Sequence, residues 1–173
     1  TSSVSAGTTD TSDPSNGEYI LDELVANGFG FVIEGPLAGA GVGSSLGHVG
    51  DWNGDGVQEI LIAAPIIDSV FVVFGGDRSG SLELKDLVPP QGGVKLQADG
   101  EFLGSSIASV GDFNGDGHED IGIGASGVDE NGFSSGRIYV LAGPQVSSVI
   151  DIASLTMQGS PDILRTIDGN GAN

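Results

Sequence analysis

The chain has 173 residues and carries 24 acidic against five basic residues, which gives a net charge of −19. This balance argues against binding to nucleic acid or anionic membranes, because phosphate contacts need Lys and Arg, and it favours cations as partners. The absence of cysteine excludes disulfides, thiolate zinc sites and cysteine nucleophiles. No run of about 18 apolar residues is present, so no membrane insertion is expected.

The N-terminal part of the chain differs in composition from the rest. Residues 1–17 are mostly Ser, Thr, Gly, Asp and Pro, which predicts a flexible linker or tail. Residues 18–42 contain one short apolar stretch, Phe31–Gly35. We interpret residues 18–42 as the C-terminal part of a preceding repeat, which supplies an extra N-terminal strand.

The remainder of the chain is repetitive. Residues Gly43–Ala64 align without gaps on Gly104–Ala125, 61 positions later. A second pattern, a short Leu- and Asp-containing turn followed by a strand-like run, begins at Leu21, Leu84 and Asp151. A period of about 60 residues points to propeller blades or another array. It divides the chain into a first repeat at 43–103, a second at 104–169 and a tail at 170–173.

Both repeats have an all-β pattern of short strands separated by turn residues. The predicted strands are Ser44–Gly50, Glu59–Ala64, Ser69–Gly75 and Val94–Ala98 in the first repeat, and Ser105–Gly111, Asp120–Gly124, Gly136–Ala142 and Ile163–Ile167 in the second. Four antiparallel strands make one propeller blade, so the predicted fold is two consecutive four-stranded blades of a partial β-propeller. A plain β-sandwich is the alternative, but it does not explain the repeat.

The two predicted blades are too few to form a closed propeller. A propeller has about four or more blades, and this sequence supplies two. Three interpretations stay open: a fragment of a longer protein, an assembly of copies, or an unfamiliar packing of two blades. The N-terminal strand could cover an exposed edge of its own chain or of a neighbour, so we expect self-association through blade edges.

Two acidic loops stand at matching positions of the repeats, Asp51–Glu59 and Asp112–Asp120. Oxygen-bearing side chains fall at the first, third, fifth and ninth loop positions, and Ca²⁺ takes about six to eight such ligands, whereas Mg²⁺ demands a stricter octahedron. The seventh position would add a backbone carbonyl. The predicted ligands of two Ca²⁺ sites are Asp51, Asn53, Asp55, Val57 and Glu59, and Asp112, Asn114, Asp116, His118 and Asp120. Trp52 and Phe113, at the second position, are expected to point away from the metal and pack.

Other interpretations of these residues are weaker. Asp, Asn and Gly also form ordinary turns, but turn chemistry does not require an acid at the ninth position of both copies. An EF-hand needs an acid at the twelfth position, where Ile62 and Ile123 stand. The G-x-S-x-G pattern at Ser45 lacks a strand–turn–helix setting, so the protein is not expected to be an enzyme. Glu119 is expected to be solvated.

The acidic loops, together with Phe102-Leu103-Gly104 and Ala63-Ala64-Pro65, resemble the FG-GAP repeat, the blade type of integrin α-subunit propellers. The resemblance covers about residues 18–169. The family's calcium loop carries over onto the ten residues given above, and Glu59 in place of the family's Asp implies a looser first site.

The resemblance also implies a function. FG-GAP repeats occur in integrins and in bacterial surface proteins, so we expect a fragment of a bacterial surface or adhesin-type protein. Its expected role is a calcium-stabilised adhesion or interaction module, extracellular or at the cell surface, that binds an unknown protein or glycan. A non-catalytic propeller portion of a secreted enzyme, or a glycan-binding module, is the alternative.

Overall fold

The computed structural model describes residues 25–28, 30–78, 80–87, 92–129, 135–143 and 149–152, together with the backbone of 163–168. Strands dominate these residues, with only short helical turns between them, so the predicted all-β class is confirmed. The chain forms two compact units, one of residues 1–33 and 78–82 and the other of residues 34–77 and 83–173. The predicted tails at 1–17 and 170–173 lie outside the described residues.

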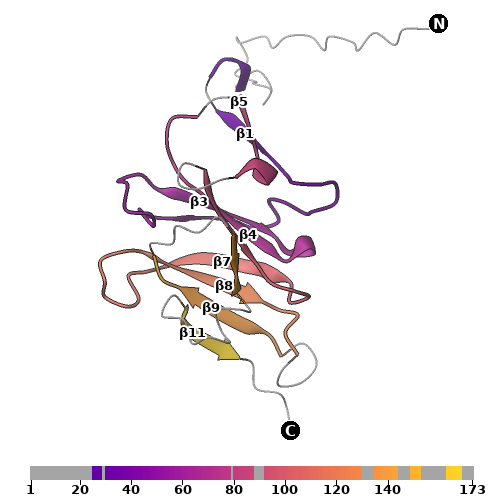
Figure 1. Cartoon of the computed structure of the whole chain (residues 1–173), viewed down its shortest axis with the longest axis vertical. Helices are drawn as coiled ribbons and strands as arrows, with labels where there is room; N and C mark the ends of the chain where they lie inside the picture. Colours follow the sequence, from indigo (N-terminus) through magenta and orange to yellow (C-terminus); the bar gives the residue numbers. More distant parts are fainter. Residues whose placement is uncertain are drawn as a thin grey trace, which may run out of the picture. The chain divides into compact units, whose positions relative to one another are not determined.

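The smaller unit is built around a two-stranded sheet. Strand β1 (Phe31–Glu34) pairs with β5 (Gly80–Glu83) (Figure 1). The extra N-terminal strand is therefore present, and its partner β5 is a strand that was not predicted. The 3-10 turn η2 (Leu84–Asp86) follows β5 and coincides with the Leu- and Asp-containing turn predicted to begin at Leu84.

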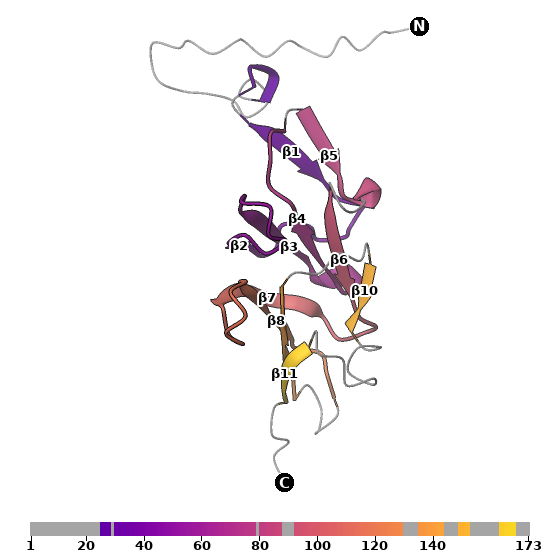
Figure 2. The same ribbon diagram turned by 60° about the vertical axis from the view of Figure 1, so that its left-hand side comes forward.

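The first blade is a five-stranded sheet in the larger unit. Its four antiparallel strands are β2 (Leu46–Val49), β3 (Glu59–Ala64), β4 (Ser69–Val73) and β6 (Gly93–Gln97). The 3-10 turn η1 (Pro65–Ile67) joins β3 to β4. A fifth strand, β10 (Val149–Asp151), runs parallel to β6 on its outer side (Figure 2). Because β10 comes from the second repeat, this strand ties the end of the chain to the first blade.

The second blade is a four-stranded antiparallel sheet in the order β11-β9-β8-β7. Its strands are β7 (Leu103–Gly111), β8 (Asp120–Ala125), β9 (Arg137–Leu141) and β11 (Ile163–Asp168). The register of β7 against β8 shifts twice, between Leu103 and Ser106 and between Ser109 and Gly111. All four strands lie where the sequence predicted them, to within two residues at each end.

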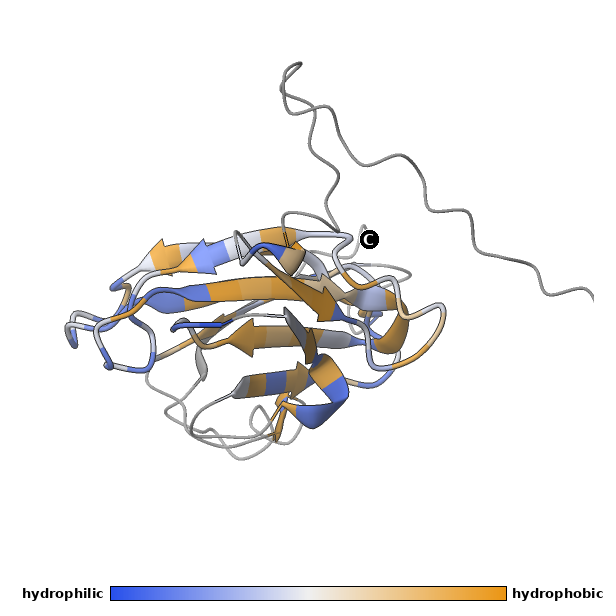
Figure 3. Ribbon diagram, turned by 90° about the horizontal axis from the view of Figure 1, so that it is seen from above, coloured by the Kyte–Doolittle hydropathy of each residue, from blue (hydrophilic) through white to orange (hydrophobic). Residues whose placement is uncertain are grey.

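The two sheets share one hydrophobic core. Strand β7 lies against β2, β3 and β4 of the first blade. Alternate residues of the strands face this core, and the residues between them on β4 and β8 are buried as well. The strands are the most apolar part of the ribbon (Figure 3). The core side chains include Val49, Leu61, Val72 and Leu96 from the first sheet and Ile121, Ile123, Tyr139 and Leu141 from the second.

The two sheets approach each other closely at Gly104. Gly104 has a φ of +88°, and a Cβ atom at this position would lie 2.8 Å from Val70 Cγ2 and 3.1 Å from Ala63 Cβ. Glycine is needed here both for the positive φ and for the contact. Gly43, its counterpart in the first repeat, has a similar φ of +83° but no neighbour within 4 Å.

Candidate metal centre

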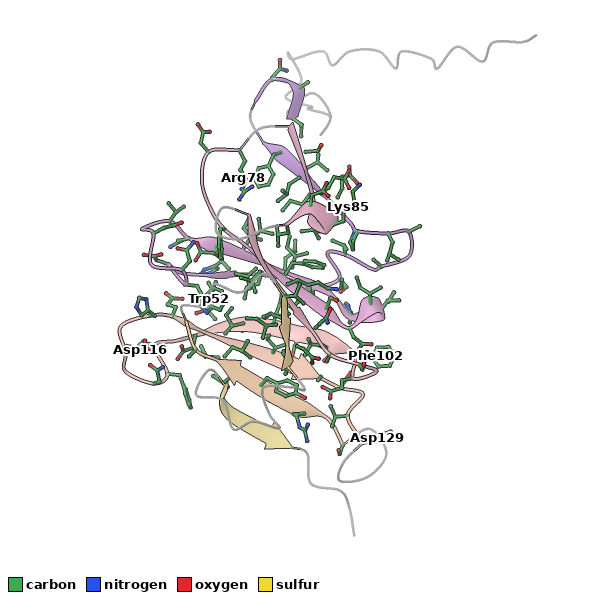
Figure 4. The ribbon with its side chains drawn as sticks, in the orientation of Figure 1. Trp52, Arg78, Lys85, Phe102, Asp116 and Asp129 are labelled. Carbon is green, nitrogen blue, oxygen red and sulfur yellow. The ribbon has the colours of Figure 1, made fainter. Side chains whose placement is uncertain are left out.

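The two acidic loops connect equivalent strands, β2 to β3 and β7 to β8, and lie at the same end of the two sheets (Figure 4). Each loop has two glycines with positive φ: Gly54 and Gly56 in the first loop, Gly115 and Gly117 in the second. These conformations cost little for glycine and let the chain reverse within a few residues. The side chains at the first, third, fifth and ninth positions can therefore face the inside of the loop.

The same side-chain hydrogen bonds shape both loops. The amide oxygen of Asn53 accepts from Asp55 N at 2.8 Å, and that of Asn114 accepts from Asp116 N at 2.8 Å. The next carboxylate continues the pattern. Asp55 Oδ1 accepts from Val57 N at 2.9 Å, and Asp116 Oδ1 accepts from His118 N at 2.9 Å. These are the local side-chain to backbone bonds that favour Asn and Asp in turns.

In the first loop the acidic groups converge. Ligand atoms of Asp51, Asp55 and Glu59 all lie within 4.8 Å of one another. Asp51 and Glu59 each use one carboxylate oxygen to accept a backbone hydrogen bond. Asp51 Oδ2 accepts from Gly56 N at 2.9 Å, and Glu59 Oε2 accepts from Trp52 N at 2.6 Å. The other oxygens, Asp51 Oδ1 and Glu59 Oε1, are buried without a hydrogen bond of acceptable geometry.

The environment of Glu59 opposes a bare negative charge. Its side chain is 1% exposed. Burial, with smaller contributions from the charges of Asp55 and Asp51, raises the pKa of Glu59 to about 7, and the N–H groups of Trp52 and Gly75 offset this only in part. Buried carboxylate oxygens without partners are costly, and a cation between them would supply the missing interaction. The residues of the first loop therefore fit a hard divalent cation such as Ca²⁺.

The second loop has the same sequence pattern but a different set of contacts. Asp112 accepts through both oxygens, from Gly115 and Asp116 N on one and from Gly117 N on the other. Asp120 is fully buried and also accepts through both oxygens, including a bond from Gly143 N at 3.2 Å. Among the described residues, three converging acidic ligands are found in the first loop alone.

The roles of the two loops thus diverge in the structure. All ten predicted ligand residues lie in the loops as expected, and their metal binding stays a prediction. The carboxylates converge in the loop that carries Glu59, where the sequence implied the looser site. The longer Glu side chain accepts from Trp52 N. Its Oε1 lacks a hydrogen bond as well formed as the one from Gly143 N to Asp120 Oδ1, although the N–H of Gly75 lowers the pKa of Glu59.

A contact between the loops was missed by the sequence analysis. Glu119, expected to be solvated, is half-buried. Its Oε2 accepts from Gly50 N of the first repeat at 2.8 Å and from Ser109 Oγ at 2.7 Å. These bonds, that of Ser109 first, hold the pKa of Glu119 below its usual value. The partner Gly50 is 69 residues away along the chain, so no local pattern could have revealed the contact.

The two aromatic residues at the second loop position have different surroundings. Trp52 is fully buried in the core between the sheets, near Gly143 (Figure 4). Phe113 is 55% exposed. The expectation that both would pack is therefore correct for Trp52 and wrong for Phe113. The reason is position in the array: the first loop is followed by a second blade, and the described part of the chain places no further blade beyond the second loop.

Comparison with known proteins agrees with this architecture. Residues 103–141, which comprise β7, β8 and β9, match the family model of the FG-GAP repeat. Integrin alpha-4 of Xenopus laevis is 32% identical over 113 residues, which cover 64% of this chain and 10% of that protein. Integrin alpha-3 is 34% identical in Cricetulus griseus and 33% in Mus musculus, over 102 residues in each case, which cover 54% of this chain and 9% of those proteins.

The chain therefore spans about a tenth of the length of these relatives. Among the described residues, no helix is long and apolar enough to cross a membrane. The matched family model falls on the second blade, and the internal repeat extends the same pattern to the first. Over the matched residues the second blade is an FG-GAP repeat, and the chain is similar to integrin α-subunits over 54–64% of its length.

Proposed function

We propose that the protein is a non-enzymatic, calcium-binding module of an extracellular adhesion or interaction protein, and that bound calcium stabilises its blades. The similarity to integrin α-subunits supports the adhesion-type role and the extracellular setting. The charge of −19 supports cations as ligands, since it disfavours the close approach of anionic partners.

The observation that carries the proposal is the pair of buried, unpartnered oxygens of the first loop. Asp51 Oδ1 and Glu59 Oε1 belong to the same converging group as Asp55. A cation would stabilise the folded state in proportion to its free concentration, because the site is assembled only by folding. For extracellular modules an affinity on the order of 10⁻⁴–10⁻³ M is sufficient.

Calorimetric titration with Ca²⁺ and thermal melts with and without EDTA test this proposal. We expect EDTA to lower the melting temperature, and Asp55→Ala to remove the heat of the first site. Asp116→Ala should remove the second site, whose carboxylates must first exchange their N–H partners for the ion. Asp99→Ala, which removes an exposed acid outside both loops, is the control for the change in net charge.

Two results would contradict the proposal. A melting temperature that is identical with Ca²⁺ and with EDTA would show that the loops close without an ion. A loss of heat in the Asp99→Ala variant equal to that in Asp55→Ala would indicate diffuse attraction by the acidic surface instead of a built site.

A further inference from the structure

Both acidic loops contain a dipeptide that can react without an enzyme. When Gly follows Asn, the glycine nitrogen can attack the amide carbon of the Asn side chain, because no Cβ atom blocks the approach and the chain holds the two groups together. The dipeptide occurs as Asn53-Gly54 in the first loop and as Asn114-Gly115 in the second. The described residues contain one more, Asn27-Gly28. The surroundings of the glycine nitrogen distinguish the three.

Gly54 differs from the comparable glycines in the state of its backbone N–H. Wherever else Gly follows Asn or Asp in the described part of the chain, the glycine N–H donates a hydrogen bond. The acceptors are Val25 O for Gly28, Asp51 Oδ2 for Gly56, Asp68 Oδ2 for Gly100, Asp112 Oδ1 for Gly115 and Asp112 Oδ2 for Gly117. Within the same described residues, the N–H of Gly54 donates to no protein group, and Gly54 is exposed. Its nitrogen is therefore the free nucleophile of the set.

The side chain of Asn53 is held in position as the electrophile. Asn53 Oδ1 accepts from Asp55 N at 2.8 Å, and Asn53 Nδ2 donates to Asp55 Oδ2 at 2.9 Å. The first bond spans Gly54, so it folds the amide group of Asn53 back toward the Gly54 peptide. It also places an N–H donor on the oxygen that becomes negative when the amide carbon is attacked. Such a donor stabilises a tetrahedral intermediate.

The second loop holds Asn114 in the same way but restrains the nucleophile. Asn114 Oδ1 accepts from Asp116 N at 2.8 Å, whereas Gly115 N donates to Asp112 Oδ1 at 2.6 Å. This second bond has to break before the nitrogen of Gly115 can attack. A carboxylate is too weak a base to take a proton from a peptide N–H, so the bond protects Asn114 and does not activate Gly115.

We propose that Asn53 is a site of spontaneous deamidation in the ion-free protein. The nitrogen of Gly54 forms a bond to Cγ of Asn53, and the bond from Cγ to Nδ2 breaks. Ammonia leaves with the proton of the Gly54 N–H, and a cyclic succinimide remains. Water then opens the ring at either carbonyl group. One opening gives aspartate, and the other gives isoaspartate, in which the backbone runs through the former side chain.

The reaction changes the loop that carries the candidate cation site. Aspartate adds a further carboxylate beside Asp51, Asp55 and Glu59. Isoaspartate lengthens the backbone by a methylene group between Asp51 and Asp55, whose ligand atoms lie within 4.8 Å of each other and of Glu59, so this product disrupts their convergence. The reaction uses only protein groups and water. It therefore does not depend on the proposed calcium binding, and it is tested in EDTA.

Peptide mapping by mass spectrometry, on the whole chain aged in mildly alkaline buffer with EDTA, tests the proposal. In the folded chain we expect Asn53 to convert about tenfold faster than Asn114 and Asn27, because a hydrogen bond on the glycine nitrogen has to break at the latter two. In urea the two loops should convert at equal rates, since both contain Asn-Gly-Asp-Gly after an aromatic residue. Isoaspartate-specific methylation should label the peptide that contains position 53.

Asp112→Ala provides the converse test, because it frees the nitrogen of Gly115. Asn114 should then convert at a rate close to that of Asn53, whereas Asp99→Ala, at an exposed acid outside both loops, should leave Asn114 unchanged. Circular dichroism establishes that both variants are folded. Equal rates at Asn53 and Asn114 in the folded wild-type chain would overturn the proposal, as would an Asn53 that does not convert. An Asn114 that stays slow in the folded Asp112→Ala chain would overturn the role assigned to the glycine hydrogen bond.

Discussion

The two repeats carry nearly the same acidic loop, and the structure gives the two loops different surroundings. In the first, Trp52 is buried under the second blade and Glu59 keeps an unpaired, buried oxygen. In the second, Phe113 is 55% exposed and the carboxylate of Asp120 is satisfied by backbone N–H groups. A motif in an array therefore does not have one fixed physical role, because its neighbours decide which of its groups are buried and which are paired.

The largest difference is expected at the two aromatic residues. Trp52→Ala would remove a fully buried side chain and leave a cavity between the sheets, so the free energy of unfolding should fall by about 3–5 kcal/mol. Phe113→Ala changes a side chain that is more than half exposed and should cost less than about 1 kcal/mol. Urea denaturation at low protein concentration, followed by circular dichroism, measures both. Equal losses in the two variants would contradict the comparison.

Much of this fold could be predicted because the repeat and the strand pattern are local. The eight strands of the two blades are found near their predicted positions. The strands β5 and β10 were missed. Each is short, and β10 forms a strand only because β6 offers a free edge beside it, which is a consequence of tertiary structure.

The candidate site was predictable in its residues and not in its contacts. The spacing of acidic residues identified both loops. It could not show that Asp51 and Glu59 each leave one oxygen unpaired, nor that Asp112 turns both of its oxygens to backbone N–H groups. Side-chain rotation decides these contacts. The bond from Gly50 N to Glu119 joins two blades, and no pattern within one repeat encodes it.

An effect of intermediate size is expected at Glu59 when calcium is removed. Its pKa in the folded protein is about 7, against 4.5 for an unperturbed Glu. Between these values the folded state keeps a proton that the unfolded state has released. The contribution of Glu59 to stability is therefore fully present below pH 4.5 and is lost as the pH rises through about 7.

Glu59→Gln isolates this contribution. In EDTA, the variant should gain about 1–3 kcal/mol of unfolding free energy relative to the wild type between pH 4.5 and pH 8, since one pKa unit corresponds to about 1.4 kcal/mol. Urea denaturation at the two pH values measures the gain. Saturating Ca²⁺ should remove the gain, because a cation lowers the pKa of a carboxyl group beside it. A difference between the two proteins that does not change with pH would contradict the assigned environment of Glu59.

The smallest effect is expected at the contact between the loops. Glu119→Gln keeps the shape of the side chain but removes the charge that strengthens its bonds to Gly50 N and Ser109 Oγ, so the loss should be about 1 kcal/mol. These bonds lower the pKa of Glu119, so its contribution is present above the unfolded pKa and is lost as the pH falls through the folded one. The stability difference between wild type and variant should therefore shrink in acid.

Gln58→Glu provides the matched control for Glu119, because it introduces the same side chain at the equivalent position of the first repeat. Gln58 is exposed, and the described part of the chain contains no preceding four-stranded blade that could donate to it as Gly50 N donates to Glu119. At protein concentrations too low for association, Gln58→Glu should change the free energy of unfolding by less than about 0.5 kcal/mol. If Gln58→Glu raised the free energy of unfolding by as much as Glu119→Gln lowers it, the acidic side chain would act within its own loop. The contact between blades would then not be the source of the stability that Glu119 provides.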